Sequence, residues 1–93
     1  MEAKPPRPTA LLKQAEKVAT EMARFLREHK AALDRGSGAA SVEDALKLAD
    51  LVVALARHGQ QIGAERVIET VSSVEIYLDD LETRLDKLLA ETK

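Results

Sequence analysis

Residues 41–58 read SVEDALKLADLVVALARH, and this segment decides the fold. On a helical projection, four of its polar residues form one narrow seam: Glu43, Lys47, Asp50 and Arg57. The apolar residues cover the remaining arc of roughly 220°, at about 100° per residue. A helix of a small bundle needs an apolar stripe little more than half that wide. The segment therefore predicts a helix that either lies at the centre of its own bundle or packs against something else.

Apolar residues also recur with helical spacing on both sides of this segment. Upstream, with Thr9 as the N-cap, a stripe alternating four and three residues apart predicts a helix over about residues 9–34: Leu11, Ala15, Val18, Met22, Phe25, His29 and Ala32. A second set of residues widens this stripe: Leu12, Ala19, Leu26 and Leu33. Downstream, a ladder of strict heptad spacing predicts an unbroken helix over about residues 64–90: Val67, Val71, Val74, Leu78, Leu81, Leu85 and Leu88.

The connections between these helices carry helix-ending and helix-starting signals. Gly36, in a Gly-Ser-Gly turn, can take the left-handed conformation that ends the first helix. Ser41 is a suitable cap for the second helix, and Gly59 is placed to end it. We therefore expect an all-α chain folded as a three-helix up-down-up bundle with coiled-coil-like packing, its helices spanning about 9–34, 41–58 and 64–90.

Length and composition limit the chain to one domain. Of its 93 residues, 1–8 are predicted to form an extended Pro-rich leader and 9–93 a single helical-bundle domain. Phe25 and Tyr77 are the only aromatic residues, so the core must consist of Leu, Val, Ile and Ala. The lack of cysteine excludes disulfides and Cys-zinc sites. No apolar run approaches the ~20 residues of a membrane span, and we expect a cytoplasmic protein that does not enter the membrane.

Charge is distributed unevenly along the chain. Residues 1–36 contain eight Lys and Arg against five Asp and Glu, whereas residues 64–93 contain four against eight. A basic row is predicted on the first helix: Lys13, Lys17, Arg24 and Arg27. An acidic row is predicted on the third: Glu75, Asp79, Glu82 and Asp86. We expect the acidic row to face the basic first helix. Acidic residues interrupt the surroundings of the basic row and no aromatics lie between its members, so nucleic acid is not an expected partner.

No residue set commits the chain to catalysis or to a cofactor. His29 and His58 lie near the ends of two antiparallel helices, which at 1.5 Å per residue separates them by roughly 20 Å or more. A shared metal site within one chain is therefore not expected. The glycines match no phosphate-binding spacing, and the serines lack a nearby base in the sequence. We expect no catalytic residue, no cofactor and no enzymatic activity.

A short stretch resembles a known family. Residues 62–67, IGAERV, followed by a long helix, resemble the segment just after the phospho-acceptor histidine in histidine phosphotransfer domains, which are helical bundles. The resemblance implies an acceptor histidine about ten residues before Gly63, where the chain has Val53. Ala56 and Arg57 stand at the downstream lysine and glycine positions. The implied protein is a degenerate phosphotransfer-like signalling domain that lacks the acceptor histidine.

Two further alternatives follow from composition. The Gly-Ser-Gly turn and the richness in Ala, Leu, Lys and Glu are typical of de novo design. Several β-branched residues near or in the third helix, Val67, Ile68 and Val71 among them, are choices that designers usually avoid. A natural or designed bundle that binds a small ligand at a polar site near His29 is the competing class of function.

The leading functional hypothesis is a non-enzymatic helical interaction module. Residues on one flank of the second helix are predicted to bind the partner: Val42, Leu46, Ala49 and Val53. The partner is either a second copy of the chain, in a two-fold homodimer, or an amphipathic helix of another protein.

Overall fold

A computed structural model describes residues 8–37, 39–62 and 64–91. Within these ranges every residue except His29 and Ile62 lies in a helix, and there is no strand. Four helices follow one another: α1 (Pro8–Glu28), α2 (Lys30–Ser37), α3 (Ala39–Gln61) and α4 (Ala64–Glu91). The predicted all-α class is confirmed. The predicted count of three helices is corrected to four over the described residues.

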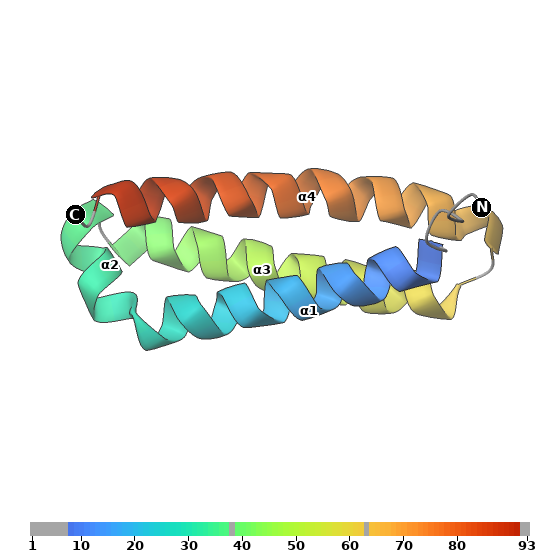
Figure 1. Ribbon diagram of the computed structural model, residues 1–93, viewed down its shortest axis with the longest axis horizontal. Coiled ribbons are helices and arrows are strands. Elements are labelled where there is room, and N and C mark those ends of the chain that lie inside the picture. Colours follow the sequence, from blue (N-terminus) through green and yellow to red (C-terminus); the bar gives the residue numbers. More distant parts are fainter. Residues whose placement is uncertain (1–7, 38, 63, 92–93) are drawn as a thin grey trace, which may run out of the picture.

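The three long helices lie along the length of the molecule, and the short α2 crosses one end of it (Figure 1). α1 and α4 run in the same direction, whereas α3 runs in the opposite direction. α3 packs against each of the other three helices. α3 packs more extensively against α1 and α4 than these two helices pack against each other, and this central position explains the wide apolar arc of α3.

The helix predicted over residues 9–34 is divided at His29. The backbone N–H of His29 donates to the Phe25 carbonyl oxygen at 3.0 Å, and the ring atom Nδ1 lies 3.0 Å from that same oxygen. The aromatic rings of Phe25 and His29 are stacked, with their centroids 4.2 Å apart. The backbone hydrogen bonding continues through the break, because the Leu33 N–H donates to the His29 carbonyl oxygen at 2.9 Å. Beyond the kink, Leu33 is buried at 2% exposure, so α2 is held across the end of the bundle by its apolar side.

Several predicted helix ends are also corrected. α1 begins at Pro8, so Thr9 is inside the first turn; proline suits that position because it lacks an N–H and has a helical φ. α2 continues through Gly36 to Ser37, and α3 begins at Ala39, before Ser41. Gly36 therefore does not end a helix and Ser41 does not begin one, contrary to the prediction. Gly38 and residues 1–7 of the predicted leader lie outside the described residues.

Gly59 does not end a helix but lies within α3, where it is buried. A Cβ atom at this position would lie 2.6 Å from Cδ1 of Leu12 on α1 and 2.7 Å from Cγ2 of Thr70 on α4. Gly59 therefore allows α3 to approach both neighbouring helices closely. The glycine is required by tertiary packing and not by a turn, which is why its local sequence context suggested the wrong role.

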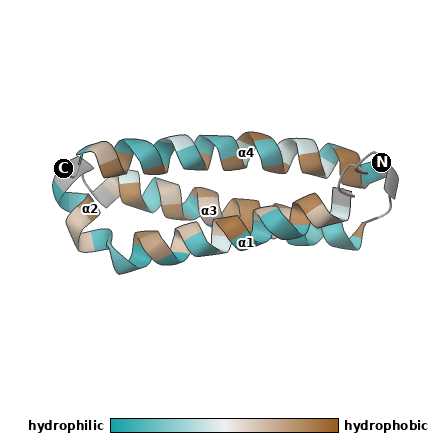
Figure 2. Cartoon of the chain, viewed as in Figure 1, coloured by the Kyte–Doolittle hydropathy of each residue, from teal (hydrophilic) through white to brown (hydrophobic). Residues whose placement is uncertain are grey.

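The core consists of aliphatic residues, as the composition predicted. Alanines dominate the contact between α1 and α3, with Ala15, Ala19 and Ala23 buried on α1 and Ala45, Ala49 and Ala56 buried on α3. Larger side chains fill the rest, and seven of them are almost fully buried: Leu12, Leu26, Leu33, Val42, Val52, Val74 and Leu81. Hydrophobic and hydrophilic residues alternate along all three long helices, as expected for amphipathic helices that share one core (Figure 2).

α4 is unbroken across Ser72-Ser73, as the heptad ladder predicted. The Ser72 hydroxyl donates to the Ile68 carbonyl oxygen at 3.2 Å, so it is satisfied within the helix. One half of the ladder is buried, namely Val67, Val74, Leu81 and Leu88. The other half is only partly buried, namely Val71, Leu78 and Leu85. None of the described helices is long and apolar enough to cross a membrane.

Candidate functional site

The four residues predicted to bind a partner all lie on α3, but they differ in exposure. Val42 and Ala49 are completely buried within the chain. Leu46 and Val53 are half-buried and pack against the same core. Leu46 and Val53 are therefore the only part of the predicted surface that reaches solvent in this fold.

Ion pairs between α1 and α3 border Leu46 and Val53. Arg27 of α1 donates to Asp50 of α3 at 3.3 Å, and Asp50 lies between the two apolar residues in the sequence. Farther along, Arg57 of α3 donates to Glu16 of α1. The Arg57 guanidinium holds the pKa of Glu16 below its ordinary value, and a hydrogen bond from Gln60 lowers this pKa further. Two members of the polar seam of α3, Asp50 and Arg57, thus bind α1 of the same chain.

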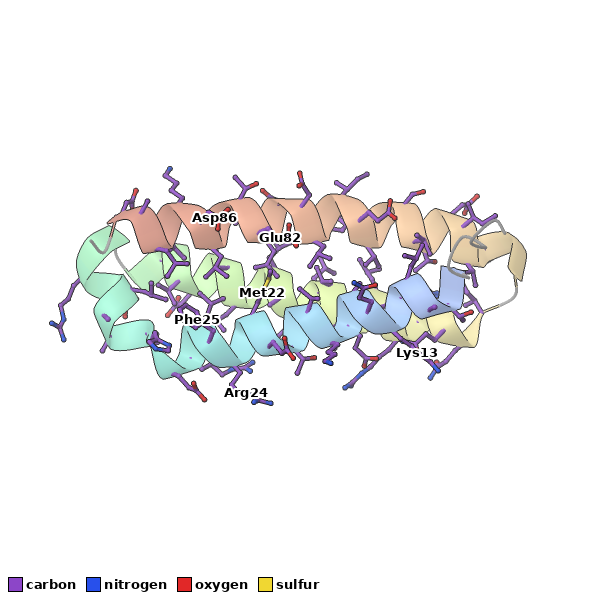
Figure 3. The ribbon with its side chains drawn as sticks, in the orientation of Figure 1. Lys13, Met22, Arg24, Phe25, Glu82 and Asp86 are labelled. Carbon is purple, nitrogen blue, oxygen red and sulfur yellow. The ribbon has the colours of Figure 1, made fainter. Side chains whose placement is uncertain are left out.

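The predicted attraction between a basic first helix and the acidic row of α4 is not observed. Among the described residues, no ion pair joins α1 to α4. Figure 3 shows Lys13 and Arg24 on the side of α1 that points away from α4, whereas Met22 and Phe25 lie on the side toward α4. Helical phase explains this result, because the basic row and the apolar stripe occupy different faces of α1.

α1 and α4 enclose an apolar groove of about 250 Å³. α1 contributes Leu11, Leu12, Gln14, Ala15 and Val18, and α4 contributes Val71, Val74, Glu75, Leu78 and Glu82. Four of the apolar side chains on its walls are only half-buried, namely Leu11, Val18, Val71 and Leu78. The groove exists because α1 and α4 pack less extensively against each other than each does against α3.

Half-buried apolar residues extend this groove toward the α2 end of the molecule. On α1 the half-buried row continues from Val18 through Met22 to Phe25, and on α4 it continues from Leu78 to Leu85. From Leu11 to Phe25 this row covers about 21 Å of helix at 1.5 Å per residue. The apolar surface between α1 and α4 therefore has the length of about four helical turns.

The outer edge of the groove on α4 follows a single heptad row, because Ile68, Glu75, Glu82 and Leu89 are seven residues apart. Glu75 and Glu82 are exposed, and both line the groove. Ile68 and Leu89, at the two ends of the row, are 63% and 36% exposed. These two side chains are large apolar groups that the chain itself leaves in contact with water.

A second cavity, of about 360 Å³, lies between the start of α3 and the end of α4 and is mainly polar. Arg84 occupies its wall, 3.3 Å from Asp80 and 3.9 Å from Asp44. Carboxylates and cations are mixed here, so this cavity presents no single sign of charge. The described residues contain no group of three or more His, Asp or Glu side chains placed to hold a metal ion.

Sequence reasoning missed the groove because α1 carries two adjacent apolar rows. The row Leu12, Ala19 and Leu26 was expected only to widen the stripe, yet it is fully buried. The row Leu11, Val18 and Phe25 was expected to be the stripe itself, yet it is half-buried beside α4. Both rows have heptad spacing, so the sequence signals two seams without saying which one α3 covers.

No family model, curated protein or solved structure matches this chain. The comparisons therefore add nothing to the short resemblance of residues 62–67 to histidine phosphotransfer domains.

Proposed function

We propose that this protein is a non-enzymatic interaction module that takes up an amphipathic helix of another protein in the groove between α1 and α4. The observation that carries this proposal is the pair of half-buried apolar rows, on α1 and α4, that flank the groove. An amphipathic helix laid into such a groove presents anchors three or four residues apart, which matches the spacing of these rows. The docked helix would act as a further member of the bundle.

The chemistry of the groove supports binding and gives no support to catalysis. Its ionisable residues, Glu75 and Glu82, are exposed and stand at its edge. General acid–base catalysis needs a sheltered pocket that separates the pKa values of two groups. The apolar side chains beside them supply contact area, which is what a helix-docking site requires.

Self-association through α3 is a second candidate. Leu46 and Val53 are only half-buried, so a second copy could cover the rest of their surface. This surface lies beside the α1–α3 ion pairs and not in the α1/α4 groove, so the two kinds of association are compatible.

The test is an NMR titration of the ¹⁵N-labelled protein with a synthetic amphipathic peptide of about 18 residues, long enough for about five helical turns. The peptide carries Leu at helical spacing and only Gln and Ser on its polar face. Saturable shifts are expected for residues 11–25 and 71–85. V18Q is expected to weaken binding at least about fivefold, through loss of apolar contact.

V53Q is the matched control, because Val53 is also a half-buried valine but lies on α3. It is expected to leave the affinity for the peptide unchanged. Shifts centred on Leu46 and Val53, or no saturable binding at all, would contradict docking in the α1/α4 groove.

A further inference from the structure

The groove carries charge of one sign along α4. Glu75 and Glu82 line it, and Asp79 and Asp86 follow on the adjacent outward row of the same helix. All four side chains are exposed. The α1 wall contributes Gln14, which is uncharged. An occupant of the groove would therefore meet an apolar floor and an acidic edge.

The cations of α4 lie on its other side. Arg84 contacts Asp80 of its own helix and Asp44 of α3. Lys87 lines the polar cavity with these residues. Arg66 shares the heptad row of Lys87, since the two are three heptads apart. The described part of α4 therefore has no cation beside the groove.

α1 does not neutralise the acidic edge either. Lys13, Lys17 and Arg24 border a shallow hollow on α1 that α4 does not reach. Arg27 is engaged with Asp50 of α3. Figure 3 shows the same separation, with Glu82 and Asp86 on α4 and Lys13 and Arg24 on the far side of α1.

The acidic edge is thus a run of like charges along one side of α4. Glu75 and Asp79, like Glu82 and Asp86, are four residues apart, a spacing at which like charges destabilise a helix. None of the four takes part in an ion pair among the described residues. A positively charged occupant would relieve this repulsion, and an acidic one would increase it.

We propose that the helix taken up by the groove is cationic. Its apolar residues would fill the floor between α1 and α4, and Lys or Arg residues beside them would pair with Glu75 and Glu82. This inference rests on the proposed helix-docking function. A second copy of the chain is a poorer occupant, because α1, α3 and α4 each already bury an apolar seam within their own chain.

The experiment compares three synthetic peptides that share one apolar face and differ only in the residues beside it, which are Lys, Gln or Glu. Isothermal titration calorimetry at low ionic strength is expected to rank their affinities Lys above Gln above Glu. We expect the Lys peptide to bind at least about tenfold more tightly than the Glu peptide, because complementary charge favours association and like charge opposes it. This preference should shrink at high salt, since the Debye length falls to about 3 Å at 1 M.

The decisive variant is the double substitution E75Q/E82Q, which removes two charges from the groove edge. It is expected to reduce the preference for Lys over Glu to about threefold or less, because the local field is weaker. The control E43Q/E69Q removes the same net charge from exposed positions that do not line the groove. It is expected to keep the preference close to that of the parent.

The outcomes separate the two proposals. Equal affinity for all three peptides, with shifts in the groove, would overturn the charge inference and leave the helix-docking function standing. Failure of all three to bind would overturn both. A preference for Lys that E43Q/E69Q reduces as much as E75Q/E82Q would overturn the charge inference, because it would assign the effect to net charge alone. Concentration-dependent shifts of the same residues without peptide would assign the groove to a second copy.

Discussion

Gly59 shows how a single residue can serve tertiary packing in this fold. It is buried in α3, and the space that a side chain would need is taken by Leu12 and Thr70. A glycine inside a helix costs about 1 kcal/mol relative to alanine. At this position the cost is offset because the absence of a side chain allows α3 to pack closely against α1 and α4.

We therefore expect G59A to lower the free energy of unfolding by about 1 kcal/mol, as measured by urea denaturation. Overpacking a core typically costs about 1–3 kcal/mol, whereas the better helix propensity of alanine returns about 1 kcal/mol. The control is A54G, at an exposed position of the same helix, which reports the propensity effect without any packing change. If G59A stabilises the protein by as much as A54G destabilises it, Gly59 is not at a close contact.

At the scale of elements, α4 is the helix whose sequence specifies it best. Its heptad ladder continues from Val67 to Leu88, and the helix spans Ala64–Glu91 without a break. The buried half of the ladder forms the seam with the rest of the bundle. The half-buried part lies beside the groove, so one helix supplies both stability and the candidate docking surface.

Val74 lies in the buried half of this ladder, at 1% exposure. We expect V74D to lower the free energy of unfolding by several kcal/mol, because a carboxylate would be desolvated without a partner. I76D is the matched control, since Ile76 is on the same helix but 67% exposed. Its effect is expected to stay below about 1 kcal/mol, because the exposed carboxylate remains hydrated and meets the like charge of Asp80 four residues on. Equal thermal melting of V74D and the parent would show that α4 is placed wrongly.

Self-association is the prediction that concerns the whole molecule. The sequence predicts a dimer at micromolar concentration through α3. Light scattering after size exclusion measures the mass directly. L46E combined with V53K is expected to give a folded monomer, because both side chains are only half-buried and so tolerate polar replacement better than core residues. A parent protein that stays monomeric at high concentration would contradict self-association.

The whole bundle also explains why the two charge rows do not meet. Attraction between a basic and an acidic helix was expected from net charge, but net charge does not fix the rotation of a helix about its axis. That rotation is set by the buried seams, Leu12, Ala19 and Leu26 on α1 and Val67 to Leu88 on α4. Apolar burial outweighs exposed ion pairs, which contribute about 0–1 kcal/mol each. The packing of these seams therefore fixes the direction in which the basic row of α1 and the acidic row of α4 point.

The sequence by itself determined the helical class, the aliphatic core and the continuous helix over residues 64–90, because residue composition and helical periodicity are local properties of the chain. It also located the helix at residues 41–58 and its excess of apolar surface. It could not determine the kink at His29 or the true ends near Gly36 and Gly59. Those depend on which distant residues come into contact.

Only the tertiary structure decided how the apolar surface is shared between core and groove. α1 has two adjacent apolar rows of the same heptad spacing. The row Leu12, Ala19 and Leu26 is buried in the core, whereas the row Leu11, Val18 and Phe25 borders the groove. On α3, the packing of the bundle buries Val42 and Ala49 and leaves Leu46 and Val53 partly exposed. The physical reason is that periodicity fixes which residues share a face of a helix, whereas the packing of three long helices around one core fixes which faces meet water.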